Sequence, residues 1–169
     1  MIRFGVPLAT LTTLGVGGPA EACAAVADLP QLLEALEAAA VRGWPVTVLG
    51  GGSNLLVADR GLRGLVLQPL IIYFKEVEQS GCTHLEVGAG VVWDNFVAEA
   101  IDRGLAGVEC LSGIPGSVGA APLQNIGAYG QEVAQTITSV RAWDRQEGKE
   151  VVLAADDCGF SYRDSHFKG

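Results

Sequence analysis

Three glycines stand together in Gly50-Gly51-Gly52-Ser53-Asn54, directly after the apolar run Val46 to Leu49. Because glycine has no Cβ, successive backbone N–H groups there can turn toward a bound anion, and the serine and asparagine add short side-chain donors. The alternative interpretation is a tight turn between two core strands, since a second apolar run, Leu55 to Val57, follows. A hairpin turn needs only one or two such residues, so the stretch is predicted to cradle a pyrophosphate.

A second stretch of small residues runs from Ser112 to Gly130. Small side chains let the main chain approach a flat ring system closely, and Gln124 and Asn125 can donate hydrogen bonds to ring carbonyls. The alternative interpretation is an irregular loop that only packs tightly. From Leu105 to Gly130 the chain has neither a helical nor a strand period and a single charge, Glu109, which favours an ordered functional loop over disorder.

Two α/β units are predicted to position these stretches, one over residues 1–68 and one over residues 69–169. In the first unit, Asp28 is the expected N-cap of a helix that ends at Gly43. Four leucines are expected on one face of that helix: Leu29, Leu32, Leu33 and Leu36. Strands are expected at residues 22–26 and 46–49.

In the second unit, one helix is predicted from Trp93 to Ile101, because its apolar residues recur at helical spacing, and Gly104 is expected to end it. Short apolar or alternating runs indicate strands, at residues 71–78, 83–87, 137–143 and 151–153. The last two are expected to be joined by the polar turn Arg145 to Gly148.

Charge and composition exclude several classes of function. The net charge of −8 argues against a nucleic-acid partner or an anionic membrane surface, which need clustered Lys and Arg. The longest apolar candidate for a membrane span, Leu65 to Phe74, is too short and contains Pro69. No signal peptide is apparent at the N-terminus, so a cytoplasmic protein is expected.

Known nucleotide and metal motifs are absent. The four cysteines lack CxxC spacing, so no metal site is predicted, and four buried thiols are expected. The run Gly15 to Ala20 matches G-x-G-x-x-A only formally, because no strand leads into it and Pro19 falls where a helix should open. No G-x-x-x-x-G-K-[ST] occurs, which disfavours a nucleoside triphosphatase.

Four stretches together resemble the UDP-N-acetylenolpyruvoylglucosamine reductase family over essentially the whole chain: Thr13–Ala20, Leu49–Val57, Ser112–Gly130 and Tyr162–Lys168. The resemblance implies an α+β fold of the FAD-binding PCMH type, like that of vanillyl-alcohol oxidase. The glycine triplet is shared loosely across that superfamily, whereas the third and fourth stretches are specific to the reductases. The residues expected to bind FAD are Gly50, Gly51, Gly52, Ser53, Asn54, Leu55, Ser112, Ile114, Pro115, Gly116, Ser117, Gly119, Ala120, Gln124, Asn125 and Gly127.

The activity implied by the resemblance is a two-step reduction in peptidoglycan precursor synthesis. NADPH reduces FAD, and hydride then passes to the enolpyruvyl double bond of UDP-N-acetylglucosamine enolpyruvate. Arg163 matches the family arginine that stabilises charge at the carboxylate end, while Tyr129 and Tyr162 are expected beside the substrate unless they are plain core residues. Because His84 and His166 match no known role, FAD is expected to be held noncovalently.

Members of that family continue beyond the Arg163 motif, into a domain that carries the proton donor and grips the UDP-sugar. The resemblance leads us to expect that this C-terminal substrate domain is missing here, and it is the expected partner of an apolar surface in a chain with 49% apolar residues. The chain alone is therefore expected to be inactive. Two alternatives stay open: an FAD-binding module without turnover, and an FAD-dependent oxidase of the same superfamily.

Overall fold

The computed structural model of the chain describes residues 1–79 and 81–168. Contacts between residues divide it into two compact units, which are described separately. Unit 1 comprises Met1–Val92 and Pro115–Ser117, and unit 2 comprises Trp93–Ile114 and Val118–Gly169. The boundary predicted between residues 68 and 69 lies inside unit 1, and as a boundary between flavin-binding subdomains it stays a prediction.

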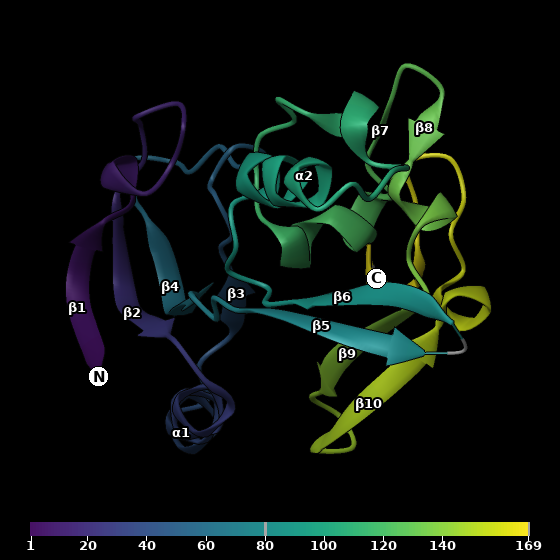
Figure 1. Cartoon of the computed structure of the whole chain (residues 1–169). Helices are drawn as coiled ribbons and strands as arrows, with labels where there is room; N and C mark the ends of the chain where they lie inside the picture. Colours follow the sequence, from purple (N-terminus) through teal and green to yellow (C-terminus); the bar gives the residue numbers. More distant parts are fainter. Residues whose placement is uncertain (80, 169) are drawn as a thin grey trace. The chain divides into compact units, whose positions relative to one another are not determined.

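Unit 1 contains a four-stranded sheet in the order β1 (Ile2–Pro7), β2 (Pro19–Val26), β4 (Leu62–Pro69) and β3 (Val46–Val48) (Figure 1). β1 is antiparallel to β2, whereas β2 and β3 both run parallel to β4. The strands predicted near β2 and β3 are confirmed, but β1 and β4 were not predicted. β4 is a central strand whose residues 64–67 are all buried, so its sequence lacks the alternation that marks a half-buried strand.

The helix α1 (Leu29–Val41) packs against this sheet and has the predicted ends. Asp28 Oδ1 accepts a 2.8 Å hydrogen bond from the Gln31 N–H, and Gly43 has φ +62° just past the last turn. The predicted leucine face is only partly the buried one: Leu32 packs against the core, but Ala35 and Ala39 are the buried residues and Leu29 is 38% exposed. Alanine lets the helix approach the sheet closely, which a periodicity of leucines does not reveal.

The glycine-rich turn follows an edge strand, not a buried one. β3 lies at the edge of the sheet, and Val48 is 60% exposed, so the expectation of a buried strand at 46–49 is wrong there. Residues 55–57 form no strand, and Leu56 is 75% exposed. The turn therefore does not join two core strands, which removes the hairpin interpretation.

Unit 1 also contains the hairpin of β5 (Phe74–Gln79) and β6 (Cys82–Val87). Both strands were predicted, although β5 begins later than expected. The carbonyls of Ile71 and Tyr73 accept hydrogen bonds from Gly90 and Gly88, so residues 71–73 pair outside the ladder.

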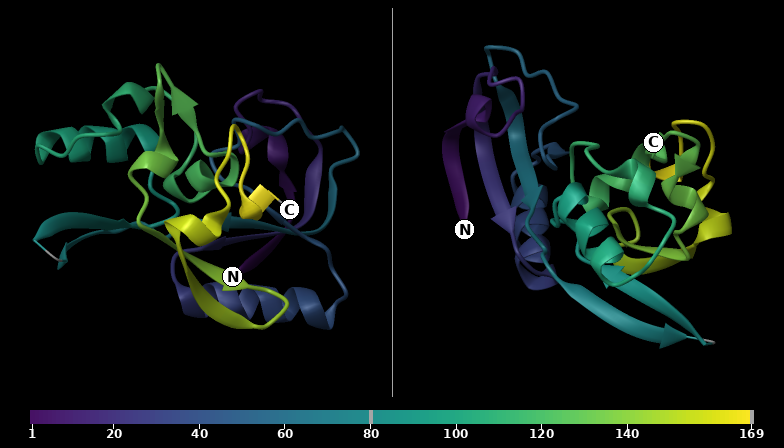
Figure 2. Two further views of the ribbon diagram at one scale, coloured as in Figure 1. Left: turned by 90° about the vertical axis from the view of Figure 1, so that its right-hand side faces the viewer. Right: turned by 45° about the horizontal axis from the view of Figure 1, so that its top comes forward.

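Unit 2 is built around α2 (Trp93–Asp102), which has the predicted helix position and is followed by Gly104 at φ +70°. β9 (Ser139–Asp144) and β10 (Lys149–Ala154) form the predicted antiparallel hairpin, drawn in yellow-green in the left view of Figure 2. Between them and α2 the chain makes short 3₁₀ turns and the small hairpin of β7 (Gly127–Ala128) and β8 (Gln131–Glu132). Such short pieces explain why residues 105–130 show no period.

The core of unit 2 joins α2 to the irregular stretch. Trp93, Val97 and Ala100 are buried against residues that include Leu111, Ala121 and Ile126. The indole Nε1 of Trp93 donates a buried 2.9 Å hydrogen bond to the Leu111 carbonyl. Apart from residues 115–117, which belong to unit 1, the stretch is thus a packed part of unit 2.

Cys23 and Cys158 are buried, and burial raises the pKa of both thiols. Cys110 is only half-buried, so the expectation of four buried thiols is wrong for it, and the side chain of Cys82 lies outside the described residues. Over residues 1–79 and 81–168, no helix is long and apolar enough to cross a membrane, and no group of His, Cys, Asp or Glu could hold a metal ion.

Candidate functional site

The glycine-rich turn Gly50–Asn54 is held at both ends by the core of unit 1. Leu49 and Val57 are buried in one apolar cluster, and the Leu49 N–H donates a 2.8 Å hydrogen bond to the Leu67 carbonyl. Within the turn, the Gly52 carbonyl accepts a 3.0 Å hydrogen bond from the Thr13 N–H. Gly52 has φ +69° and lies so close to residues 11 and 12 that no side chain fits.

The backbone donors of this turn are unused. In the described part of the chain, none of the five N–H groups from Gly50 to Asn54 donates a hydrogen bond to a protein acceptor. The turn contains no carboxylate, so no negative charge of its own repels an anion. Free N–H groups in a glycine-rich turn form an anion-binding concavity, which supports the predicted pyrophosphate cradle.

The central residues of the second glycine-rich stretch meet this turn within unit 1. A Cβ on Gly51 would stand 3.2 Å from the Cα of Gly116, whose own φ is +132°. Ser53 Oγ lies 3.5 Å from the Pro115 carbonyl oxygen, and Ser117 forms a β-bridge with Val92. The sequence predicted that the two glycine-rich stretches bind different parts of the cofactor, but residues 51–53 and 115–116 lie against each other in unit 1.

The first residues of that stretch belong to unit 2, where Asp94 holds them. One carboxylate oxygen of Asp94 accepts hydrogen bonds from Gly113 N at 2.7 Å and from Ser112 Oγ at 2.8 Å. These bonds, the one from Gly113 first, lower the pKa of the Asp94 carboxyl. Sequence reasoning missed Asp94; an acidic residue in the first turn of a helix was the available signal.

Asn125 is a structural residue. It is 2% exposed, with Nδ2 donating to Glu132 Oε2 at 2.8 Å and to the Ser161 carbonyl at 3.1 Å. Its Oδ1 accepts from the Ala134 N–H at 3.1 Å. Both hydrogens of the amide are thus engaged, so the donor role predicted for Asn125 toward a flavin carbonyl has no free N–H. The half-buried Gln124 makes no side-chain hydrogen bond with another described residue.

The remaining predicted cofactor residues stay predictions. Ile114 packs partly on the core of unit 2, and Leu55 packs partly on that of unit 1. Gly119 and Ala120 are half-buried in the 3₁₀ helix Val118–Gln124, and Gly127 starts β7.

Both tyrosines predicted beside the substrate are on the surface. Tyr129 is 93% exposed and Tyr162 is 83% exposed, which excludes the alternative that they are core residues. Tyr129 and Gly130 have φ +50° and +86° at the centre of the β7–β8 hairpin, as in a type I′ turn. The hairpin therefore presents the phenol of Tyr129 to solvent.

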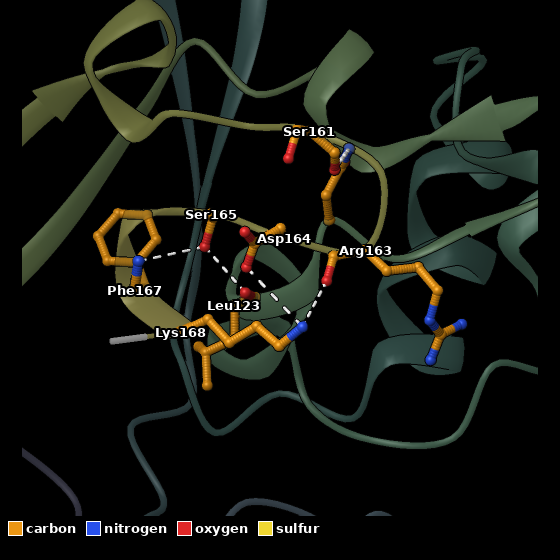
Figure 3. Close-up of polar contacts among 8 residues, drawn as sticks. Leu123, Ser161, Arg163, Asp164, Ser165, Phe167 and Lys168 are labelled. Carbon is orange, nitrogen blue, oxygen red and sulfur yellow. Dashed lines mark hydrogen bonds and ion pairs between the residues drawn. The ribbon is translucent and has the colours of Figure 1, made fainter.

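Arg163 lies in a tight turn of unit 2. Ser161 and Asp164 exchange backbone hydrogen bonds of 3.1 and 3.2 Å, and Arg163 between them has φ +54°. A left-handed backbone costs a non-glycine residue about 1–2 kcal/mol. The Lys168 ammonium donates a 2.8 Å hydrogen bond to the Arg163 carbonyl and lies 3.8 Å from Asp164 Oδ1 (Figure 3).

The Arg163 guanidinium itself is exposed and forms no ion pair with a described residue. Neighbouring arginine and aspartate residues often form a solvated ion pair, but Arg163 forms none with the adjacent Asp164. Ser165 is nearby but only 8% exposed, and its hydroxyl is engaged with the Leu123 carbonyl at 2.8 Å and the Phe167 N–H at 3.2 Å. Arg163 is thus the free charged group of this segment.

Comparison with known proteins agrees with this geometry. A family model described as "FAD binding domain" matches residues 20–154. A UDP-N-acetylenolpyruvoylglucosamine reductase from Thermobifida fusca is 49% identical over 166 residues, which are 97% of this chain and 46% of that protein. The chain thus spans less than half the length of this curated relative.

Solved structures show the same fold. The reductase of that name from Thermus caldophilus matches with a TM-score of 0.78 and 34% identity, over 98% of this chain and 56% of that one. The 6-hydroxy-D-nicotine oxidase from Arthrobacter nicotinovorans matches with a TM-score of 0.62 and 21% identity, over 82% of this chain and 31% of that one. The predicted α+β fold of the vanillyl-alcohol oxidase type is confirmed.

Proposed function

The chain belongs to the FAD-binding domain family, and from that premise we propose that it is the flavin-binding part of a UDP-N-acetylenolpyruvoylglucosamine reductase. The observation that carries the proposal is the turn Gly50–Asn54 of unit 1, whose N–H groups donate to no acceptor in the described chain and which lies against Gly116 at Gly51. Its backbone donors suit the pyrophosphate of FAD, because they need no basic side chain in a chain of net charge −8.

The fit of the cradle to FAD is steric as well as electrostatic. Gly51 and Gly116 allow two backbone segments to approach within the space that one Cβ would fill. Of the residues that follow, Ser117, Gly119, Ala120, Gln124 and Gly127 would supply the remaining contacts to FAD, whereas Asn125 has no free N–H for it. We propose that FAD is held noncovalently, and His166 already has its Nδ1 within 2.8 Å of the Asp157 carbonyl.

The chemistry supplied by bound FAD is hydride transfer from NADPH to the enolpyruvyl double bond of UDP-N-acetylglucosamine enolpyruvate. Arg163 would bind the carboxylate of that group, because its planar guanidinium can form two parallel hydrogen bonds and has no ion-pair partner in the described chain. Negative charge grows toward the carboxylate during the reduction, so a fixed cation there stabilises the transition state more than the ground state. Tyr129 and Tyr162, both exposed, would contact the substrate from the same unit.

The test of the proposal is titration of the purified chain with FAD, followed by flavin fluorescence and visible absorbance. A yellow chain that retains FAD through gel filtration is expected. A colourless chain that leaves the fluorescence and absorbance of added FAD unchanged would refute the proposal. NADPH oxidation, measured with and without UDP-N-acetylglucosamine enolpyruvate, then reports whether bound FAD turns over. We place the reaction in the cytoplasm, where NADPH is supplied.

A second candidate is an FAD-binding module without turnover, and one observation favours it. The chain spans only 46% of the Thermobifida fusca reductase, so groups outside this segment would have to supply the proton and grip the nucleotide. FAD binding without NADPH oxidation is the expected result for a module. An oxidase is distinguished by peroxide formation, and the 21% identity to the nicotine oxidase concerns the fold alone.

A further inference from the structure

In the segment Ser161–Lys168, the Lys168 ammonium contacts both the carbonyl of Arg163 and the carboxylate of its neighbour Asp164. Its Nζ donates a 2.8 Å hydrogen bond to the Arg163 carbonyl and stands 3.8 Å from Asp164 Oδ1. Figure 3 shows the Arg163 side chain extending away from both residues. Asp164, the neighbour of Arg163 in the sequence, therefore forms its ion pair with Lys168.

The backbone of the turn is held independently of this ion pair. Asn125 Nδ2 donates to the Ser161 carbonyl at 3.1 Å, and Ser165 Oγ donates to the Leu123 carbonyl at 2.8 Å. Asn125 and Ser165 are 2% and 8% exposed, so both anchors are buried. Because neither of these contacts involves Lys168, removal of the lysine side chain would free the Asp164 carboxylate and leave both contacts in place.

Asp164 is the nearest competitor for the guanidinium. The two side chains leave adjacent positions of a tight turn, and an arginine pairs readily with a carboxylate in two hydrogen bonds. A guanidinium paired with Asp164 would not be available to a substrate carboxylate. The Lys168 ammonium offers the Asp164 carboxylate a different partner, whose position is set by its hydrogen bond to the Arg163 carbonyl.

We propose that Lys168 is a positioning residue that keeps the Arg163 guanidinium free by holding the Asp164 carboxylate. The inference deepens the proposed function, since Arg163 matters there as the group that binds a carboxylate. Lys168 acts through Asp164 and Arg163 and need not touch the substrate. The proposal differs from a purely structural role because removing Asp164 should reverse the effect of removing Lys168.

The direct test is the NMR signal of the Arg163 Nε–Hε group in the chain itself, without ligand. Lys168→Met keeps the length of the side chain but removes its charge, and the Hε signal is expected to move downfield as Asp164 pairs with the guanidinium. Adding Asp164→Asn to that variant should return the signal to its wild-type position. Lys168→Arg, which retains the cation, should leave the signal near wild type.

The matched control is Lys149→Met. Lys149 forms an ion pair of similar exposure with Glu147, at 3.7 Å, in the β9–β10 turn. That control should leave the Arg163 signal in place. An unchanged Hε signal in a folded Lys168→Met variant, or a shifted signal that Asp164→Asn does not restore, would overturn the proposal.

A binding measurement links the effect to the proposed function. With FAD present, the affinity of the chain for UDP-N-acetylglucosamine enolpyruvate is expected to fall roughly tenfold in Lys168→Met and to recover within about twofold in the double variant. Equal affinity of wild type and Lys168→Met would count against the inference. If the wild-type chain binds neither FAD nor this sugar, the proposed function fails, and the ligand-free NMR signal still decides whether Lys168 protects Arg163.

Discussion

Gly52 lies directly against Leu11: a Cβ on Gly52 would overlap the Leu11 carbonyl oxygen and stand 2.9 Å from Thr12 Cα. The Gly52 carbonyl also accepts the 3.0 Å hydrogen bond from Thr13 N. The turn Gly50–Asn54 is thus folded onto the segment between β1 and β2. Its shape depends on a contact between parts of the chain that are distant in sequence.

The Gly52→Ala variant should destabilise the chain and weaken FAD binding. Gly43→Ala is the matched control, because Gly43 has φ +62°, close to the +69° of Gly52, but has open space where the Cβ would lie. The left-handed backbone accounts for a loss of about 1 kcal/mol in both variants, and the clash at Gly52 should add about 2 kcal/mol. Urea unfolding and FAD titration of both variants measure the difference; equal losses would contradict the steric argument.

Asp94 should control the order of residues 112–114. Asp94→Ala removes the acceptor of the Ser112 hydroxyl and the Gly113 N–H, so amide exchange at Gly113 is expected to accelerate. FAD affinity should fall roughly tenfold, because the segment is no longer pre-organised. Asp144→Ala is the control: Asp144 likewise accepts two backbone N–H groups, but in the β9–β10 turn. If both variants bind FAD equally, Asp94 has no part in the site.

Acid should destabilise the chain through three carboxyls that accept backbone hydrogen bonds. Hydrogen bonds from backbone N–H groups hold the pKa of each of these carboxyls, Asp94, Glu109 and Asp144, below its usual range. The largest effect comes from the Gly113 N–H at Asp94 and from the Glu147 N–H at Asp144. A depressed folded pKa means that the stabilisation is present above the unfolded carboxyl range, about pH 4, and is lost as pH falls through the folded pKa.

The unfolding temperature of the chain, followed by circular dichroism from about pH 6 to about pH 2, should therefore fall most steeply below about pH 4. The triple variant Asp94→Asn, Glu109→Gln, Asp144→Asn keeps oxygen acceptors that do not titrate, and its curve should be flatter. An identical slope in both proteins would show that other groups cause the acid loss.

Asn125→Ala should cause a large loss of stability. The change leaves the Ser161 carbonyl, the Glu132 carboxylate and the Ala134 N–H without a shared partner, and a loss of about 3 kcal/mol is expected. Gln124→Ala, at the neighbouring half-buried amide, should change the free energy of unfolding by less than about 1 kcal/mol. Urea unfolding of both variants distinguishes a structural Asn125 from a dispensable one.

Local patterns in the sequence were sufficient for much of the fold. The Asp28 cap, the glycine ends of both helices, the stripe of α2 and the β9–β10 hairpin depend on neighbouring residues, and each was predicted. The motif around Arg163 and the glycine-rich stretches also pointed to the family without any structure. These features arise from backbone sterics and helical or strand periodicity, which act over a few residues.

Only the tertiary structure decided which distant residues meet. The packing of Gly116 on Gly51 and the hydrogen bond from Asn125 to the Ser161 carbonyl have no local signature. The central strand β4 was not predicted for a related reason: both of its faces are buried, so its sequence does not alternate between apolar and polar residues. Long-range contacts determine such pairings, because each residue has several chemically acceptable partners until the chain folds.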